Sequence, residues 1–242
     1  MRWKSRSLMV GGALALLAGT AHADVRVIHA SPDAPNVDVY VNQMIGTDTP
    51  AIENLGFTEG TPYIDLPSDD YNFQVTPFGE TSPVVIDTNA TIDDSLDYSV
   101  VASGFLSGIS PNVYVDDNTI DPNNARVRFI HQSPDAPAVD IFANNSINLF
   151  DAVSFGESGG YQTVAPGDYD IDVRLDSNGM TVLDDLDLSF EAGSVYTVFA
   201  MGSAEAGTLD AVVFTDAVIP APGAAGLLGA AVLFGRRRRR SR

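Results

Sequence analysis

Short stretches of alternating apolar and polar residues recur along most of the chain. Val37–Val41 and Tyr169–Val173 alternate strictly, so each stretch has one apolar face and one polar face. This period of two is typical of β-strands that are buried on one side only. Asn178-Gly179, between two such stretches, predicts a tight hairpin turn. The pattern therefore predicts an all-β protein with short strands and tight connections.

The pattern occurs twice in the chain. Residues 25–42 read VRVIHASPDAPNVDVYVN and residues 127–144 read VRFIHQSPDAPAVDIFAN, at a constant spacing of 102 residues. We predict two tandem copies of one module, at 24–120 and 125–217, joined by a polar linker rich in turn residues. About seven short strands in each copy favour two Ig-like antiparallel β-sandwich domains, with a small open barrel as the alternative.

Both copies carry the same polar motif between two predicted strands. Its residues are His29, Ser31, Pro32, Asp33, Pro35 and Asp38 in the first copy, and His131, Ser133, Pro134, Asp135, Pro137 and Asp140 in the second. Serine followed by proline suits the first two positions of a type I turn. If the flanking strands are neighbours, each histidine could reach the aspartate that ends its motif. We interpret the motif mainly as a structural brace.

Two chemical functions of the motif remain open. Asp33 and Asp38, or Asp135 and Asp140, could bind Ca²⁺ together with a loop carbonyl, because hard cations prefer several oxygen ligands. A histidine beside a serine or an aspartate could instead serve a secreted hydrolase. Ser31, however, precedes a proline and is not part of a nucleophile elbow. We predict no catalytic residues and no cofactor other than this calcium.

The first 23 residues have the three parts of a secretory signal peptide. Arg2, Lys4 and Arg6 precede the apolar stretch Leu8–Ala18, and Ala21 and Ala23 form a small–x–small cleavage pattern. The apolar stretch is shorter than the about 20 residues of a membrane-spanning helix. We expect signal peptidase to cleave after Ala23 and the protein to be exported.

Residues 218–242 form a second sorting signal. Pro220 and Pro222 precede a short apolar stretch, 223–234, which we expect to be helical, and a basic cluster follows: Arg236, Arg237, Arg238, Arg239 and Arg240. Basic residues after an apolar segment stay on the cytoplasmic side, which predicts transient membrane association. The order resembles the PEP-CTERM tail of Gram-negative bacteria, although Ala221 stands where that motif has glutamate. The resemblance implies processing by an exosortase-like sorting protease; a plain membrane anchor is the alternative.

The charge of the chain is strongly divided. All 32 acidic residues lie between Asp24 and Asp216, a stretch with only four arginines and no lysine, so its net charge is −28. Such an acidic protein repels nucleic acid and anionic membranes, and we expect no nucleic-acid partner.

The chain has no cysteine, which excludes disulfides, thiol catalysis and thiolate metal sites.

The doubled motif His-x-Ser-Pro-Asp-Ala-Pro-x-Val-Asp resembles the DUF4397 family, often found as tandem modules in exported bacterial proteins. The resemblance implies a β-sandwich on a secreted or surface protein and no established reaction. We therefore expect a non-enzymatic cell-envelope, surface or extracellular-matrix protein whose modules bind or display an unknown partner. A calcium-stabilised adhesion or assembly protein is the alternative, and a secreted hydrolase is a third possibility.

Overall fold

The computed structural model describes residues 23–219. Of the predicted signal peptide, residues 1–23, only Ala23 is described, as the buried first residue of the first strand. Of the predicted tail, 218–242, only Val218 and Ile219 are described; the rest of both segments lies outside the described residues. Within them, every regular element is a β-strand except one short 3₁₀ turn, Leu106–Gly108. No helix in this part of the chain is long and apolar enough to cross a membrane.

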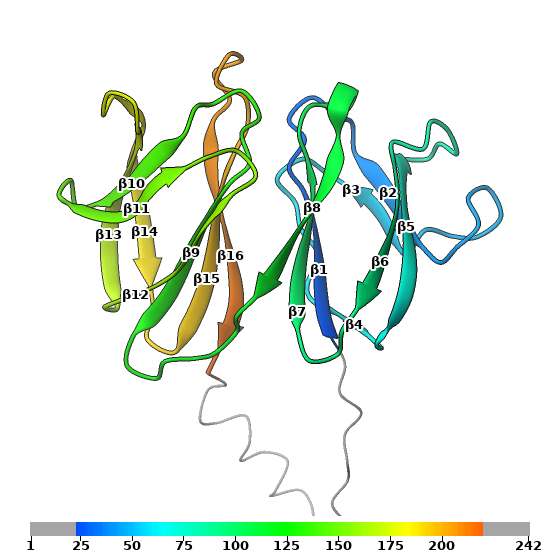
Figure 1. Ribbon diagram of the computed structural model, residues 1–242, viewed down its shortest axis with the longest axis horizontal. Helices are drawn as coiled ribbons and strands as arrows, with labels where there is room; N and C mark the ends of the chain where they lie inside the picture. Colours follow the sequence, from blue (N-terminus) through cyan, green and yellow to red (C-terminus); the bar gives the residue numbers. More distant parts are fainter. Residues whose placement is uncertain (1–22, 220–242) are drawn as a thin grey trace, which may run out of the picture.

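Residues 23–116, the first half, form two four-stranded sheets packed face to face (Figure 1). The inner sheet, nearer the second half, has the order β4-β1-β7-β8, and the outer sheet has the order β3-β2-β5-β6. The strands are β1 (Ala23–His29), β2 (Val37–Val41), β3 (Ile52–Leu55), β4 (Ile64–Leu66), β5 (Asp69–Pro77), β6 (Ile86–Ile92), β7 (Asp97–Ser103) and β8 (Ser110–Asp116).

Residues 125–218, the second half, repeat this arrangement. The inner sheet has the order β12-β9-β15-β16, and the outer sheet has the order β11-β10-β13-β14. The strands are β9 (Ala125–His131), β10 (Val139–Ala143), β11 (Ile147–Val153), β12 (Ser158–Val164), β13 (Gly167–Leu175), β14 (Thr181–Phe190), β15 (Ser194–Met201) and β16 (Asp210–Val218).

The predicted all-β sandwich architecture is confirmed, with two differences in detail. The described residues contain eight strands in each half, where the sequence pattern predicted about seven. β1 pairs with β7, and β9 with β15, in parallel, so the inner sheets are mixed and not purely antiparallel. The period-two pattern reports which face of a strand is buried, and this is the same for both directions of pairing.

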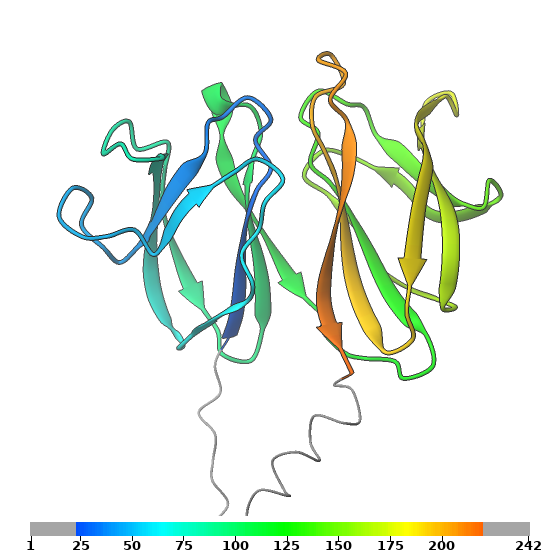
Figure 2. The same ribbon diagram turned by 180° about the vertical axis from the view of Figure 1, so that it is seen from behind.

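The two inner sheets also pack against each other, so the molecule has four layers (Figure 2). Apolar side chains from both halves meet at this contact, among them Ile28 and Val101 from the first half and Ile130, Phe199 and Met201 from the second, all fully buried. A strand of the inner sheet is therefore covered on both faces. This explains why β15 is buried at all eight of its positions.

Candidate functional site

Each copy of the motif forms a loop braced by its histidine. His29 ends β1, and its Nε2 lies 3.0 Å from the carbonyl oxygen of Pro35, while its Nδ1 accepts a hydrogen bond of 3.3 Å from the backbone N–H of Ser31. Since Nδ1 accepts, Nε2 carries the proton and donates. Pro32 lies in the turn, as expected. The imidazole thus holds the two sides of the loop together.

The second copy has the same geometry. His131 Nε2 lies 3.1 Å from the carbonyl oxygen of Pro137, and its Nδ1 accepts from the N–H of Ser133 at 3.2 Å. Pro134 again lies in the turn. Burial lowers the pKa of both His29 and His131, and the loop carbonyls of Pro35 and Pro137 act in the opposite direction. Both rings are therefore neutral at pH 7, inaccessible to solvent and engaged at both nitrogens.

The prediction that histidine and aspartate of one motif meet is wrong. The loop carries the chain from the inner sheet to the outer sheet, so β1 and β2 are not neighbours. Asp38 instead accepts hydrogen bonds from the backbone N–H groups of Asn54 and Gly79, both at 2.9 Å. Asp38 thereby holds strand β3 and the connection between β5 and β6, and His29 braces the motif without it.

The other motif aspartates hold a different loop. Asp33 accepts from the N–H of Leu106 at 2.6 Å, in the turn between β7 and β8. Asp135 accepts from Ser203 Oγ at 2.6 Å and from the N–H of Ala204 at 2.8 Å, in the equivalent turn. Desolvation raises the pKa of Asp135, but these hydrogen bonds and others lower it to about 2. Asp33 and Asp38 therefore bond to different segments of the chain. Among the described residues, none of Asp33, Asp38 and Asp135 belongs to a group of three side chains close enough to share a metal ion.

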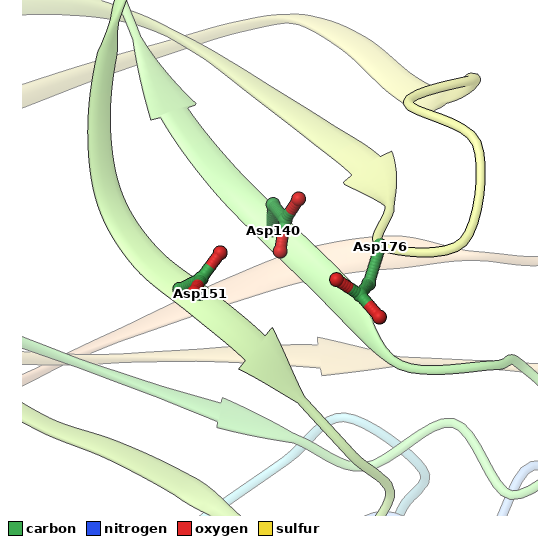
Figure 3. Close-up of side chains that lie close together, drawn as sticks. All are labelled: Asp140, Asp151 and Asp176. Atoms are coloured by element: carbon green, nitrogen blue, oxygen red, sulfur yellow. The ribbon is translucent and has the colours of Figure 1, made fainter.

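Asp140 does join an acidic cluster, but with partners that the sequence did not predict. Figure 3 shows Asp140 on β10, Asp151 on β11 and Asp176 after β13, with their carboxylates directed toward one another. One oxygen from each lies within 4.8 Å of the others, and Asp151 and Asp176 are exposed. Asp140 also accepts from the N–H of Ala152 at 2.8 Å. Three carboxylates at this spacing could hold a divalent cation.

This acidic cluster belongs to the second half alone. The N–H of Asp176 bonds the carbonyl of Ala138, as the N–H of Phe78 bonds that of Asn36, so Phe78 occupies the equivalent position in the first half. Sequence spacing could not reveal the cluster, because its members come from three separate segments. Comparison of the two copies could have pointed to the cluster, since Asp176 in the second copy stands where the first copy has Phe78.

A buried charge cluster between the two inner sheets was also not predicted. Arg26 on β1 forms a salt bridge of 2.8 Å with Asp216 on β16, and Arg128 on β9 forms one with Asp116 on β8. The side chains of both aspartates are fully buried, and those of both arginines are 3% exposed. Each pair joins the two halves, and the two pairs are equivalent by the internal repeat.

Two hydroxyl groups complete the charge cluster. Ser99 Oγ accepts from Arg26 at 2.8 Å and donates to Asp116 at 2.7 Å. Thr197 Oγ1 accepts from Arg128 at 2.9 Å and donates to Asp216. Burial raises the pKa of Asp216, and the nearby Arg26 opposes this shift. The cluster connects the halves by charge-assisted hydrogen bonds that both halves must supply.

Comparison with solved structures returns only distant similarity. A carbohydrate-binding CBM26 module of Eubacterium rectale Amy13K, solved with maltoheptaose, is 14% identical, covers 80% of this chain and 97% of its own, and has a TM-score of 0.25. An α-glucan-binding streptococcal virulence factor is 8% identical, covers 77% of this chain and 95% of its own, and has a TM-score of 0.24. Similarity at this level supports no argument about this chain's ligand.

Comparison by sequence is more informative. No curated protein matches the chain. The family model for a domain of unknown function, DUF4397, matches residues 23–142 and again residues 125–228. These two matches overlap and cover most of the chain; the first contains both copies of the braced loop, and the second contains the copy formed around His131. The chain belongs to the DUF4397 family.

Proposed function

We propose that this chain is an exported, non-enzymatic protein of the cell envelope or extracellular matrix whose two sandwiches bind or display a partner. One observation carries the proposal: the histidines and the turn aspartates of the motif common to both halves make structural contacts. Both ring nitrogens of His29 and of His131 bond within their own loops. Asp33 and Asp135 accept hydrogen bonds from neighbouring turns. These side chains therefore serve the scaffold.

The contact between the halves supports a role in display. The buried salt bridges of Arg26 and Arg128 cross from one half to the other. Salt bridges of this kind require precise geometry, since each charge left unpaired would cost several kcal/mol. The two outer sheets therefore keep a fixed separation and orientation. Such a unit presents two related surfaces to a partner at once.

The predicted sorting signals support a location outside the cytoplasm. Signal peptidase would remove the first 23 residues, and an exosortase-like protease would recognise the tail that begins near Pro220. The strongly acidic middle of the chain suits an exterior location where salt screens its self-repulsion. The envelope or matrix partner then defines the function of the protein.

Deletion of residues 220–242 tests the proposed sorting. The truncated chain should appear in the soluble periplasmic or secreted fraction, because it lacks the apolar segment and the arginine cluster that follows. Cell fractionation followed by immunoblotting measures the distribution. Replacement of Arg236–Arg240 by lysines keeps the positive charge and serves as the control. Surface retention equal to that of the full chain would contradict the sorting signal.

A calcium-stabilised assembly protein is a second candidate, favoured by Asp140, Asp151 and Asp176. If these carboxylates bind Ca²⁺ with a Kd of about 1 mM, typical of extracellular modules, 10 mM Ca²⁺ adds about 1.4 kcal/mol to the stability. The melting temperature of the full chain should then rise by about 3–6 °C relative to chelator. Asp176→Asn should remove this shift, and Asp184→Asn on the exposed face of β14 should keep it. An identical melting temperature with calcium and chelator would eliminate this candidate.

A further inference from the structure

The core of the first half is hollow. A cavity of about 230 Å³ lies between its two sheets, lined by apolar side chains that include Val27, Val39, Leu55, Val75 and Ile86. The equivalent space in the second half is only about 20 Å³. Protein cores are normally packed as densely as organic crystals, so a void of this size in one of two related modules requires a cause in the sequence.

Strand β6 supplies part of that cause. Phe73 lies opposite Thr88, and Tyr71 opposite Ala90, between β5 and β6. The register between β13 and β14 puts Leu186 and Leu188 at the positions of Thr88 and Ala90. Both leucines pack against the core of the second half. In the first half the same two positions carry much smaller side chains, and the space remains open.

Two aromatic residues fill the rest of the space in the second half. Phe129 occupies the position of Val27, 102 residues further along the chain, and Phe150 occupies the position of Ile52 on the strand beside β10. The rings of Phe129 and Phe150 stack with their centroids 6.0 Å apart. Valine and isoleucine cannot reach across the gap between sheets in this way. The two halves thus have the same arrangement of strands and differ in the side chains that fill the space between the sheets.

The cavity reaches the surface between two edge strands. β6 ends the outer sheet and β8 ends the inner sheet (Figure 1). Val113 on β8 lines the cavity, yet 54% of its surface is exposed, and its neighbour Val115 is 53% exposed. Thr88 and Thr91 on β6 also line the cavity. A ligand can therefore enter from the side without separation of the sheets.

We propose that this cavity binds an uncharged, largely apolar small molecule. An apolar cavity of about 150 Å³ is enough to bind benzene, so this one accepts a somewhat larger ring system or short hydrocarbon chain. None of the four arginines in the described part of the chain lines the cavity, so a carboxylate or sulfate group would find no cation to pair with. The net charge of −28 between Asp24 and Asp216 also repels anions. This inference goes beyond the proposed function, because it assigns a ligand site to one half only.

N-phenyl-1-naphthylamine, an uncharged probe that fluoresces in apolar surroundings, tests the proposal. The full chain should bind it saturably, and Thr88→Leu with Ala90→Leu should weaken that binding at least tenfold by filling the cavity. Leu186→Thr with Leu188→Ala is the reciprocal variant and should create a second site. The chain termini are the same in all variants, so differences between variants report the cavities.

Two further measurements keep the test decisive. 1-Anilinonaphthalene-8-sulfonate is the same ring system with an added sulfonate, and it should bind at least tenfold more weakly. The melting temperature of the filled variant should equal or exceed that of the wild type, which separates lost binding from lost folding; Val27→Phe replaces this variant if it does not fold. Equal binding of the uncharged probe by wild-type and filled chains, or tighter binding of the sulfonate, would overturn the proposal. The fractionation assay for sorting is independent of either outcome.

Discussion

Replacement of Arg128 by methionine should lower the free energy of unfolding by about 3–5 kcal/mol. Methionine keeps the length of the side chain but removes the cation. The fully buried carboxylate of Asp116 then loses its close salt bridge with Arg128 and, of its ionic contacts, keeps only the longer one of 4.0 Å with Arg26. The substitution also removes the hydrogen bonds that Arg128 donates to Thr197 Oγ1 and to the carbonyl of Val115. Urea unfolding of the full chain, followed by circular dichroism, measures the change.

Arg126 provides a matched control on the same strand. It lies two residues from Arg128 and pairs with Asp117, whose side chain is 53% exposed. Since water can solvate Asp117 after the arginine is removed, Arg126→Met should cost about 1 kcal/mol or less. Similar losses for the two variants would contradict the role assigned to the buried cluster.

Replacement of both partners separates two effects on the free energy of unfolding: the loss caused by an unpaired buried charge, and the contribution of the ion pair itself. In the variant Arg128→Met with Asp116→Leu, no buried charge remains without a partner at this position. Buried ion pairs replaced by apolar side chains are often close to neutral in stability. The double variant should therefore recover much of the loss caused by Arg128→Met. A loss as large as, or larger than, that of the single variant would show that the apolar replacement does not fit the interface.

Replacement of His131 by phenylalanine should lower the free energy of unfolding by about 2–5 kcal/mol. Phenylalanine keeps an aromatic ring, somewhat larger than the imidazole, but the carbonyl of Pro137 and the N–H of Ser133 lose their partners. A buried polar group left without a hydrogen bond costs about 1–3 kcal/mol. His29→Phe should have an effect of the same size, since its contacts are equivalent. A decrease in the free energy of unfolding below about 1 kcal/mol in both variants would contradict the role of these histidines as braces of the loops.

The pH dependence of stability gives a second measure of the same side chains. Burial lowers the pKa of His29 and His131 below the ordinary value of 6.5. The unfolded chain therefore binds more protons than the folded chain below about pH 6.5, and stability falls as the pH is lowered through this range. The variant with both histidines replaced by phenylalanine should lose this component of the pH dependence. Parallel curves of stability against pH for the wild type and this variant would contradict the contribution of the two histidines.

Local sequence signals were sufficient for the architecture of each half. Alternation along Val37–Val41 and the turn chemistry of Pro32 and Pro134 depend on neighbouring residues, and the structure has a strand and turns where they were expected. The direction of pairing between β1 and β7 was predicted incorrectly, because a strand shows the same alternation in parallel and antiparallel sheets. The partner of His29 was also predicted incorrectly, since the loop changes sheets.

The sequence alone determines the internal repeat, the β-sandwich class and the family of this protein. These features follow from local periodicity and from a motif that occurs twice. Tertiary structure alone decided which distant side chains meet. Arg26 and Asp216 are 190 residues apart, and no local pattern relates them. The acidic cluster of Asp140 and the cavity beneath Thr88 likewise depend on packing between strands. The two halves share a hydrophobic pattern but differ in side-chain volume, and volume becomes visible only when the sheets are packed.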